Sequence, residues 1–357
     1  MKDKASKTIK VLLVATSTRE IGGQSIQAKR LLDAFAGDEQ IEMEFLPNNP
    51  ETLFQNIKYL RTIFASLKFW QLLLTRVYKS DVVLVSSAAM TGYIISTLPP
   101  LWVSKIYGRK VILNYHSGEL EKHITTWRRT ALPTMRKFDR IAVPSQFLAD
   151  IFAKFHLKAK AIFNFVDGTN FKFRERETFR PVFLSNRNFE AHYQVSDVLR
   201  AFQIIQERFS EAELLVAGTG TEETKLKQLT AELKLKNVRF VGKLSNEEMA
   251  RLYEKTDIYL NSSVVDNMPL SFIEAFSCGL PVVSYATGGI PYLVENGETG
   301  ILVEPGNFEA LAQKAIFLLE NQEFAKKIVA KAQAEVVKYS WENVHCSWVE
   351  LCTELAE

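Results

Sequence analysis

The sequence predicts an α/β protein made of two doubly wound parallel sheets, and three observations support this fold class. Short apolar, β-branched runs alternate with amphipathic segments of helical length along almost the whole chain, a pattern typical of parallel strands covered by helices. The alternation occurs in both halves of the chain. The length of 357 residues suits two domains of ordinary size.

Each half contains six strand candidates. In the first half they are Lys10–Ala15, Met43–Leu46, Asp81–Val85, Lys110–Asn114, Arg140–Val143 and Ala161–Phe163. In the second half they are Val182–Leu184, Glu213–Ala217, Val238–Val241, Ile258–Leu260, Val282–Ser284 and Gly300–Val303. Ser245 and Glu248 have the spacing of a capping box, which predicts that a helix begins there.

The stretch 164–180 separates the two halves. It is rich in charge and has neither helical nor alternating periodicity, so we interpret it as a linker. We expect an N-terminal domain at 1–168, joined by a C-terminal helix at 340–357, and a C-terminal domain at 169–339. Ligands of such sheets bind outside the carboxyl ends of the strands, so we expect the two lobes to face each other across a cleft.

The composition is typical of a globular protein, with 47% hydrophobic and 24% charged residues. The apolar stretch 11–15 is too short for a signal peptide, and prolines and hydroxyl residues interrupt 88–103, so we expect a cytoplasmic protein. Cys278, Cys346 and Cys352 have the spacing of neither a zinc site nor a disulfide framework, and we expect packed thiols.

Charge is unevenly distributed along the chain. Residues 1–170 hold 24 Lys/Arg and 14 Asp/Glu, net +10, whereas residues 171–357 hold 20 and 27, net −7. Residues 58–79 mix basic with aromatic and leucine side chains, and 127–129 add a second such spot. These segments suit an anionic membrane or a lipid-linked acceptor, but they equally suit an apolar face packed on the sheet. No nucleic-acid-binding motif accompanies the charge, so we expect no nucleic acid partner.

The most informative block of the chain is 264–306. It combines Asp266, a helix that begins near Pro269, Glu274 inside that helix, and a later pair of glycines at 288–289. Free N–H groups at the start of the helix favour a phosphate. The missing side chains of the glycine pair let backbone approach a ligand. Taken singly, a helix, a strand and a glycine turn are also ordinary α/β structure.

The ends of this helix can be predicted from local chemistry. Asn267 suits an N-cap, and Pro269 suits the first turn because its missing N–H would have no partner there. Gly279 is expected to end the helix just after Ser277. Three loops after earlier strands also carry candidate residues, namely 16–24, 115–119 and 185–192.

In this order the motifs resemble family 4 of the retaining glycosyltransferases, which have the GT-B fold of two Rossmann-like lobes and use nucleotide-sugar donors. The resemblance rests on IGGQSIQAKRLL, NYHSGE, AVPSQFLADIF, FNFVD, SNRNFE, ELLVAGTGTEETKL, NVRFVGKLSNEEMARLYEKTDIYLNSS and the block 264–306. As an ordered set these motifs are highly specific.

The resemblance implies a site and roles for its residues. Glu274 would hold the ribose hydroxyls, Asp266 would contact the donor sugar, Arg187 would bind the diphosphate, and His116 would lie near the sugar. The residues implied as catalytic are His116, Arg187 and Asp266. The residues implied as donor-binding are Gly22, Gly23, Arg187, His192, Gly218, Val241, Gly242, Asp266, Asn267, Met268, Pro269, Leu270 and Glu274.

Three positions depart from the family's usual pattern. Asp266 stands where glutamate is usual, His192 replaces a lysine, and Tyr292 replaces a glutamate. The carboxylate at 266 is one methylene shorter, and the charge at 192 depends on pH. Together they leave open a second interpretation, a catalytically weak partner subunit that binds a nucleotide-sugar.

The function we expect is retaining hexosyl transfer from a UDP- or GDP-sugar to a hydroxyl of a glycan or lipid-linked acceptor in cell-envelope synthesis. Positive groups would neutralise the leaving diphosphate, so we expect no metal and no other cofactor. Lobe closure would exclude water. We expect the protein in the cytoplasm, at the inner face of the membrane. A GT-B-fold nucleotide-sugar epimerase is a further alternative, and a dehydrogenase is disfavoured because no G-x-G-x-x-G follows the first strand.

Overall fold

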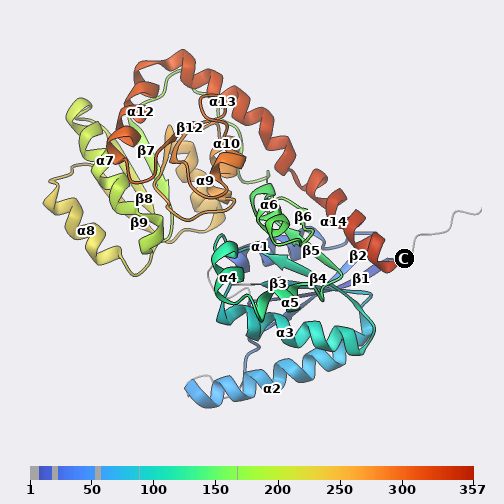
Figure 1. The fold of residues 1–357 in the computed structure, drawn as a ribbon. Coiled ribbons are helices and arrows are strands. Elements are labelled where there is room, and N and C mark those ends of the chain that lie inside the picture. Colours follow the sequence, from blue (N-terminus) through green and yellow to red (C-terminus); the bar gives the residue numbers. More distant parts are fainter. Residues whose placement is uncertain (1–7, 18–22, 53–57, 88, 167) are drawn as a thin grey trace, which may run out of the picture. The chain divides into compact units, whose positions relative to one another are not determined.

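The computed structural model describes residues 8–17, 23–52, 58–87, 89–166 and 168–357. The chain divides into two compact units, an N-terminal unit of Met1–Phe163 with Val344–Glu357 and a C-terminal unit of Asn164–Asn343. Within the described residues, each unit is a six-stranded parallel sheet covered by helices (Figure 1). The predicted fold class is therefore confirmed for both units.

The sheet of the N-terminal unit has the order β2-β1-β3-β4-β5-β6. Its strands are β1 (Ile9–Ala15), β2 (Ile41–Pro47), β3 (Val82–Ser87), β4 (Lys110–Tyr115), β5 (Arg140–Val143) and β6 (Lys160–Ala161). Its helices are α1 (Gly23–Ala34), α2 (Lys58–Arg76), α3 (Thr91–Ile106), α4 (Leu120–Thr126), α5 (Ala131–Met135) and α6 (Gln146–Lys154). The side chains of Leu13, Leu84 and Leu113 on the central strands are fully buried, as expected for a sheet with both faces covered.

The chain returns to the N-terminal unit through α14 (Trp341–Ala356). Lys160 of β6 forms an ion pair with Glu350, and Arg140 Nε of β5 lies 3.6 Å from Glu354 Oε2. Cys352 of the same helix is buried, but Cys346 is exposed, so the expectation of packed thiols is wrong for Cys346. The C-terminal helix is thus tied to the edge of the first sheet.

The sheet of the C-terminal unit has the order β9-β8-β7-β10-β11-β12. Its strands are β7 (Val182–Asn186), β8 (Glu213–Ala217), β9 (Val238–Gly242), β10 (Ile258–Asn261), β11 (Val282–Tyr285) and β12 (Ile301–Val303). Its helices are α7 (Val195–Arg208), α8 (Glu223–Glu232), α9 (Asn246–Lys255), α10 (Leu270–Ser277), α11 (Ile290–Leu293), α12 (Phe308–Glu320) and α13 (Gln322–Val336). The strand order changes direction between β7 and β10, which makes this point the topological switch of the sheet.

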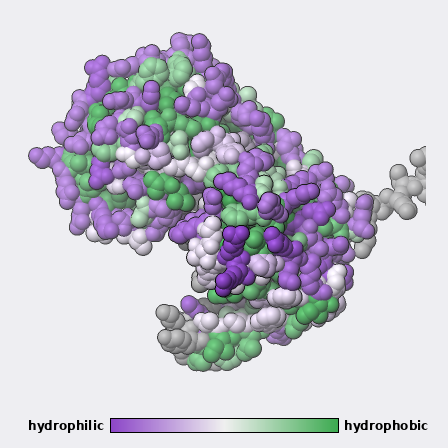
Figure 2. Space-filling model, in the orientation of Figure 1, coloured by the Kyte–Doolittle hydropathy of each residue, from purple (hydrophilic) through white to green (hydrophobic). Residues whose placement is uncertain are grey.

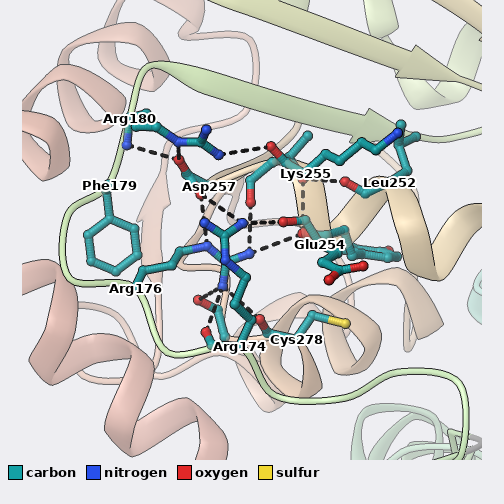
Figure 3. Close-up of polar contacts among 12 residues, drawn as sticks. Arg174, Arg176, Phe179, Arg180, Leu252, Glu254, Lys255, Asp257 and Cys278 are labelled. Carbon is teal, nitrogen blue, oxygen red and sulfur yellow. Dashed lines mark hydrogen bonds and ion pairs between the residues drawn. The ribbon is translucent and has the colours of Figure 1, made fainter.

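The predicted linker 164–180 lies in the C-terminal unit, where a buried arginine anchors it (Figure 3). Arg176 Nε donates to Asp257 Oδ1 at 2.9 Å. Its Nη atoms donate to main-chain carbonyls at the ends of α9 and α10, namely those of Tyr253, Thr256, Cys278 and Gly279. Helix C-termini carry unpaired carbonyls and partial negative charge, so one guanidinium stabilises two helix ends.

Helix α10 ends as the sequence predicts. Gly279 has a φ of +75°, and its N–H donates to the carbonyl of Phe276 at 3.1 Å. The N–H of Leu280 donates to the carbonyl of Ala275 at 2.8 Å, which completes a Schellman motif. A Cβ at position 279 would lie 2.8 Å from the ring of Phe173, so glycine is required here by both conformation and space.

Replacing Arg176 by alanine should lower the free energy of unfolding by about 3 kcal/mol, because four buried carbonyls lose a donor and Asp257 loses a charged partner. Urea unfolding measures this change. Arg208→Ala is the matched control, since Arg208 pairs with Glu320 on the surface, and its effect should stay below about 1 kcal/mol. Equal losses in the two variants would contradict the anchoring role of Arg176.

Candidate functional site

Two predicted site residues meet at the switch point of the C-terminal sheet. Arg187 directly follows β7, and Asp266 lies in the loop after β10. The two strands are parallel neighbours, with Leu184 opposite Tyr259, so their carboxyl ends share one edge of the sheet. Doubly wound sheets bind ligands at this edge, where the strand order reverses.

The guanidinium of Arg187 forms an ion pair with the carboxylate of Asp266. Its Nη1 lies 3.4 Å from Ser271 Oγ, and the group lies over the ring of Tyr193 at 4.3 Å from the centroid. Within the described part of the chain, Arg187 Nε is buried without a hydrogen-bond partner. Burial would lower the pKa of Arg187, but the Asp266 carboxylate raises it above its usual value. The group therefore stays charged and keeps donor capacity for a ligand.

Glu274 of α10 is buried beside Tyr253 of α9. The Tyr253 hydroxyl lies 3.2 Å from Glu274 Oε2 and 3.0 Å from the carbonyl oxygen of Ser271. Asn186 Nδ2 donates to the same hydroxyl at 3.0 Å. Burial and the charge of Glu274 raise the pKa of Tyr253 well above its usual value. The hydroxyl therefore remains a hydrogen-bond donor to the carboxylate.

These contacts form one connected group, which we call the switch-point cluster: Asn186, Arg187, Tyr253, Asp266, Ser271 and Glu274. The sequence predicted Arg187, Asp266 and Glu274 as site residues. It did not single out Asn186, Tyr253 or Ser271. Of these three, Asn186 could have been found from the sequence, because it is a polar residue close to the end of a predicted strand and directly precedes Arg187.

The loop before α10 differs from the prediction in one respect. Pro269, not Asn267, occupies the N-cap position, with a ψ of 117° and no side-chain cap. The N–H of Asn267 donates a hydrogen bond to Asp266 Oδ1 at 2.9 Å. Proline disfavours helical backbone at the residue before it, so the helix begins only at Leu270. The N-cap prediction for Asn267 was wrong, whereas the helix itself was correctly predicted.

The glycine pair holds this loop through direct backbone contact. A Cβ at Gly288 would lie 2.0 Å from the carbonyl oxygen of Asp266, and one at Gly289 would lie 2.0 Å from that of Asn267. Gly289 N–H donates to the Asp266 carbonyl at 3.1 Å. The close approach expected for a ligand is therefore made by the protein's own loop. These glycines position the residues of the site.

The other predicted binding residues of the C-terminal unit lie on neighbouring loops. A Cβ at Gly218 would lie 2.1 Å from the carbonyl oxygen of Arg187, and the Gly218 N–H donates to the carbonyl of Gly242 at 2.9 Å. Val241 and Gly242 end β9. His192 is exposed in the short turn η2 (Ala191–Tyr193), with its ring 4.1 Å from that of Tyr193. Met268 and Pro269 are buried, and Leu270 is half-buried.

The predicted residues of the N-terminal unit lie on different loops. His116 directly follows β4 and is half-buried, and burial lowers its pKa to about 4. Its ring is therefore neutral at physiological pH. Gly23 is the first residue of α1, and Gly22 lies outside the described residues. His123 of α4 is buried, with Nδ1 3.0 Å from the Tyr115 hydroxyl.

The described ranges lack both a cluster of metal ligands and a membrane-spanning helix. They contain no group of three or more His, Cys, Asp or Glu side chains that could hold a metal ion. None of their helices is long and apolar enough to cross a membrane.

Residues 167–335 match the sequence model of the family described as glycosyl transferases group 1. The chain is 34% identical over 151 residues to N-acetyl-alpha-D-glucosaminyl L-malate synthase of Bacillus anthracis, covering 42% of this chain and 39% of that protein. It is 28% identical over 166 residues to phosphatidyl-myo-inositol mannosyltransferase of Mycobacterium leprae, covering 46% of this chain and 44% of that protein. The chain thus spans less than half the length of either relative.

A solved structure with a similar fold is that of Anabaena HepE in complex with UDP. The TM-score is 0.76 with 16% sequence identity, over 97% of this chain and 100% of that one. At this identity the likeness concerns the fold, and it agrees with the GT-B class that the motifs implied.

The low pKa of His116 predicts how stability depends on pH. The ring titrates near 6.5 when unfolded and near 4 in the native protein, so the unfolded state binds more protons between these values. The free energy of unfolding should therefore decrease as pH falls from about 6.5 to about 4. In His116→Gln this decrease should be smaller than in the wild type. Denaturant unfolding across this pH range measures both decreases, and identical curves for His116→Gln and wild type would contradict the burial effect.

Proposed function

We propose that the protein transfers a sugar from a nucleoside-diphosphate-sugar to an acceptor hydroxyl, and the match of residues 167–335 to the model of the glycosyl transferases group 1 supports this. The observation that carries the proposal is the switch-point cluster. It places a buried cation and two carboxylates together at the edge of the sheet where such folds bind ligands.

Glu274 is proposed to bind the ribose of the donor. A carboxylate that accepts two hydroxyl groups is a strong and directional anchor. The hydroxyl of Tyr253 approaches Glu274 Oε2 from α9 and restricts the orientation of the carboxylate. The contact of Tyr253 with the Ser271 carbonyl fixes that hydroxyl in turn, so the carboxylate is preorganised before the nucleotide arrives.

Arg187 is proposed to bind the diphosphate. Its planar fork suits phosphate oxygens, and its Nε is a buried donor without a partner among the described residues. The first turn of α10 presents further N–H groups with partial positive charge beside Asp266. Asp266 neutralises Arg187 before binding. We propose that the Asp266 carboxylate and the backbone of residues 267–270 contact the donor sugar.

The proposed reaction retains the configuration of the anomeric carbon. The acceptor oxygen forms a bond to that carbon on the face from which the diphosphate leaves, and the bond between the carbon and the diphosphate oxygen breaks. The proton of the acceptor hydroxyl passes to the departing phosphate oxygen. Arg187 and the start of α10 stabilise the negative charge that develops there. In this proposal these fixed positive groups take the place of a metal ion.

The donor is proposed to be a UDP- or GDP-hexose. The UDP complex of a protein with a similar fold supports a uridine nucleotide, but the cluster itself contacts parts shared by both donors. His116, neutral at physiological pH, is proposed as a catalytic residue of the N-terminal unit. Gly22, Gly23 and His192 complete the proposed donor-binding set.

The acceptor is proposed to be a glycan or a lipid-linked molecule of the cell envelope. The relative that carries phosphatidyl-myo-inositol in its name supports a lipid acceptor. The net charge of +10 in residues 1–170 supports contact with an anionic membrane. We propose that the protein works on the cytoplasmic side of that membrane.

Two variants separate the proposed roles in the donor site. Arg187→Ala should lower the affinity for the nucleotide, UDP or GDP, by roughly 10- to 100-fold. The affinity for inorganic pyrophosphate should fall equally, because both ligands need the guanidinium. Glu274→Gln should lower the affinity for the nucleotide by about tenfold and leave the affinity for pyrophosphate unchanged, because only the nucleotide carries a ribose. Calorimetry or thermal stabilisation measures these affinities.

Arg208→Ala is the control, since Arg208 lies in an exposed ion pair of the same unit, and it should bind as the wild type does. Unchanged nucleotide affinity in Arg187→Ala would remove this residue from the site. Transfer should proceed equally with and without EDTA. Tight nucleotide-sugar binding without turnover on any acceptor would favour the partner-subunit alternative, and an isomerised free donor would indicate an epimerase.

A further inference from the structure

Helix α2 has two apolar faces, and the unit covers only one of them. Phe69 and Leu73 are buried in the core of the N-terminal unit, followed by Val77 in the turn η1 (Val77–Lys79). These residues are four positions apart and lie on one side of the helix. They account for the packing of α2 on its own unit.

A second set of large apolar side chains on α2 is exposed. Its members are three or four residues apart and so share one face. We call this the outer face: Leu60, Ile63, Leu67, Trp70 and Leu74. Ile63 is 55% and Leu67 61% exposed, and Figure 2 shows apolar colour along this helix. Packing on the sheet therefore does not explain why the segment 58–79 is apolar on both sides.

The neighbouring helix α3 adds a second exposed apolar stripe. Ile95, Trp102 and Ile106 are seven and four residues apart and share one face, and Ile106 is 74% exposed. The ring of Tyr78, just after α2, lies 6.2 Å from that of Tyr107, just after α3. The C-terminal ends of the two helices are thus in contact. Exposed apolar surface of this extent marks an interaction site on a soluble domain.

The charged residues of α2 and α3, and of the turns that follow them, are all basic. The segment 58–79 and the segment 91–110 contain no Asp or Glu. Their basic residues are Lys58, Arg61, Lys68, Arg76, Lys79, Lys105, Arg109 and Lys110. Arg76 pairs with Glu44 and Lys105 with Asp139 on other elements, and Lys68 Nζ donates to the main-chain carbonyl of Glu51 at 2.8 Å.

We propose that the outer face of α2, together with the exposed stripe of α3, docks on the surface of an anionic lipid bilayer. The apolar side chains would enter the boundary between head groups and acyl chains, and the basic ones would contact lipid phosphates. Trp70 suits this depth because its indole is amphipathic. The basic residues of these two segments, with no acidic residue among them, favour an anionic bilayer over a neutral apolar partner. The inference rests on the lipid-linked acceptor of the proposed function and identifies the surface that would bring the protein to it.

Sedimentation of the full chain with vesicles tests the proposal. Vesicles of phosphatidylcholine with phosphatidylglycerol should bind the protein, vesicles of phosphatidylcholine alone should bind it at least tenfold more weakly, and added salt should weaken binding. Ile63→Ser with Leu67→Ser should weaken binding to anionic vesicles by at least about tenfold. Arg61→Gln should weaken it by about fivefold. Val337→Ser, at an apolar position of the C-terminal unit that is 63% exposed, is the control and should bind as the wild type does.

Two results would overturn the inference. One is wild-type protein that does not bind anionic vesicles. The other is a double variant that binds anionic vesicles as tightly as the wild type. If the only defect of that variant is the loss of self-association in sedimentation velocity, the surface binds a second copy of the chain instead. Thermal stabilisation by UDP or GDP, measured on the same variants, should be unchanged. Failure of nucleotide binding in the wild type, with vesicle binding intact, would contradict the donor site alone.

Discussion

The ion pair between Arg187 and Asp266 is the interaction on which the candidate site depends. It joins the loops after β7 and β10, the two strands between which the sheet order reverses. A buried charge needs a partner, so each of these residues determines where the other lies. Because Gly288 has no side chain, its backbone packs closely against the Asp266 carbonyl. This contact positions the loop that carries the Asp266 carboxylate. Sheet topology, charge and close backbone packing thus define one geometry.

Helix α10 connects the site to the arginine network of the segment 164–180. Its N-terminal end follows the Asp266 loop, Glu274 projects from its middle, and its last carbonyls accept hydrogen bonds from Arg176. The same guanidinium binds the end of α9, which supplies Tyr253 to the site. The segment 164–180 therefore stabilises both α9, which carries Tyr253, and α10, which carries Ser271 and Glu274.

Most of the fold could be predicted from the sequence because its signals are local. Buried parallel strands are short apolar runs, and all of the predicted strands overlap observed ones, although β6 is shifted to Lys160–Ala161. The N-cap prediction at Asn267 was wrong because the backbone restriction by Pro269 outweighed the preference of asparagine. Tyr253 was missed because its contact with Asn186 spans 67 residues, a tertiary relation that no local pattern contains. The two apolar faces of α2 could be read as periodicity, but only the structure distinguishes the packed face from the exposed one.

A crystal structure of the protein with the nucleoside diphosphate that stabilises it most would test the central claim most directly. The account predicts diphosphate oxygens within hydrogen-bond distance of Arg187 Nε or Nη, and ribose hydroxyls on the carboxylate of Glu274. A nucleotide bound elsewhere, with the Arg187–Asp266 pair unchanged and Glu274 in contact with Tyr253 alone, would contradict it.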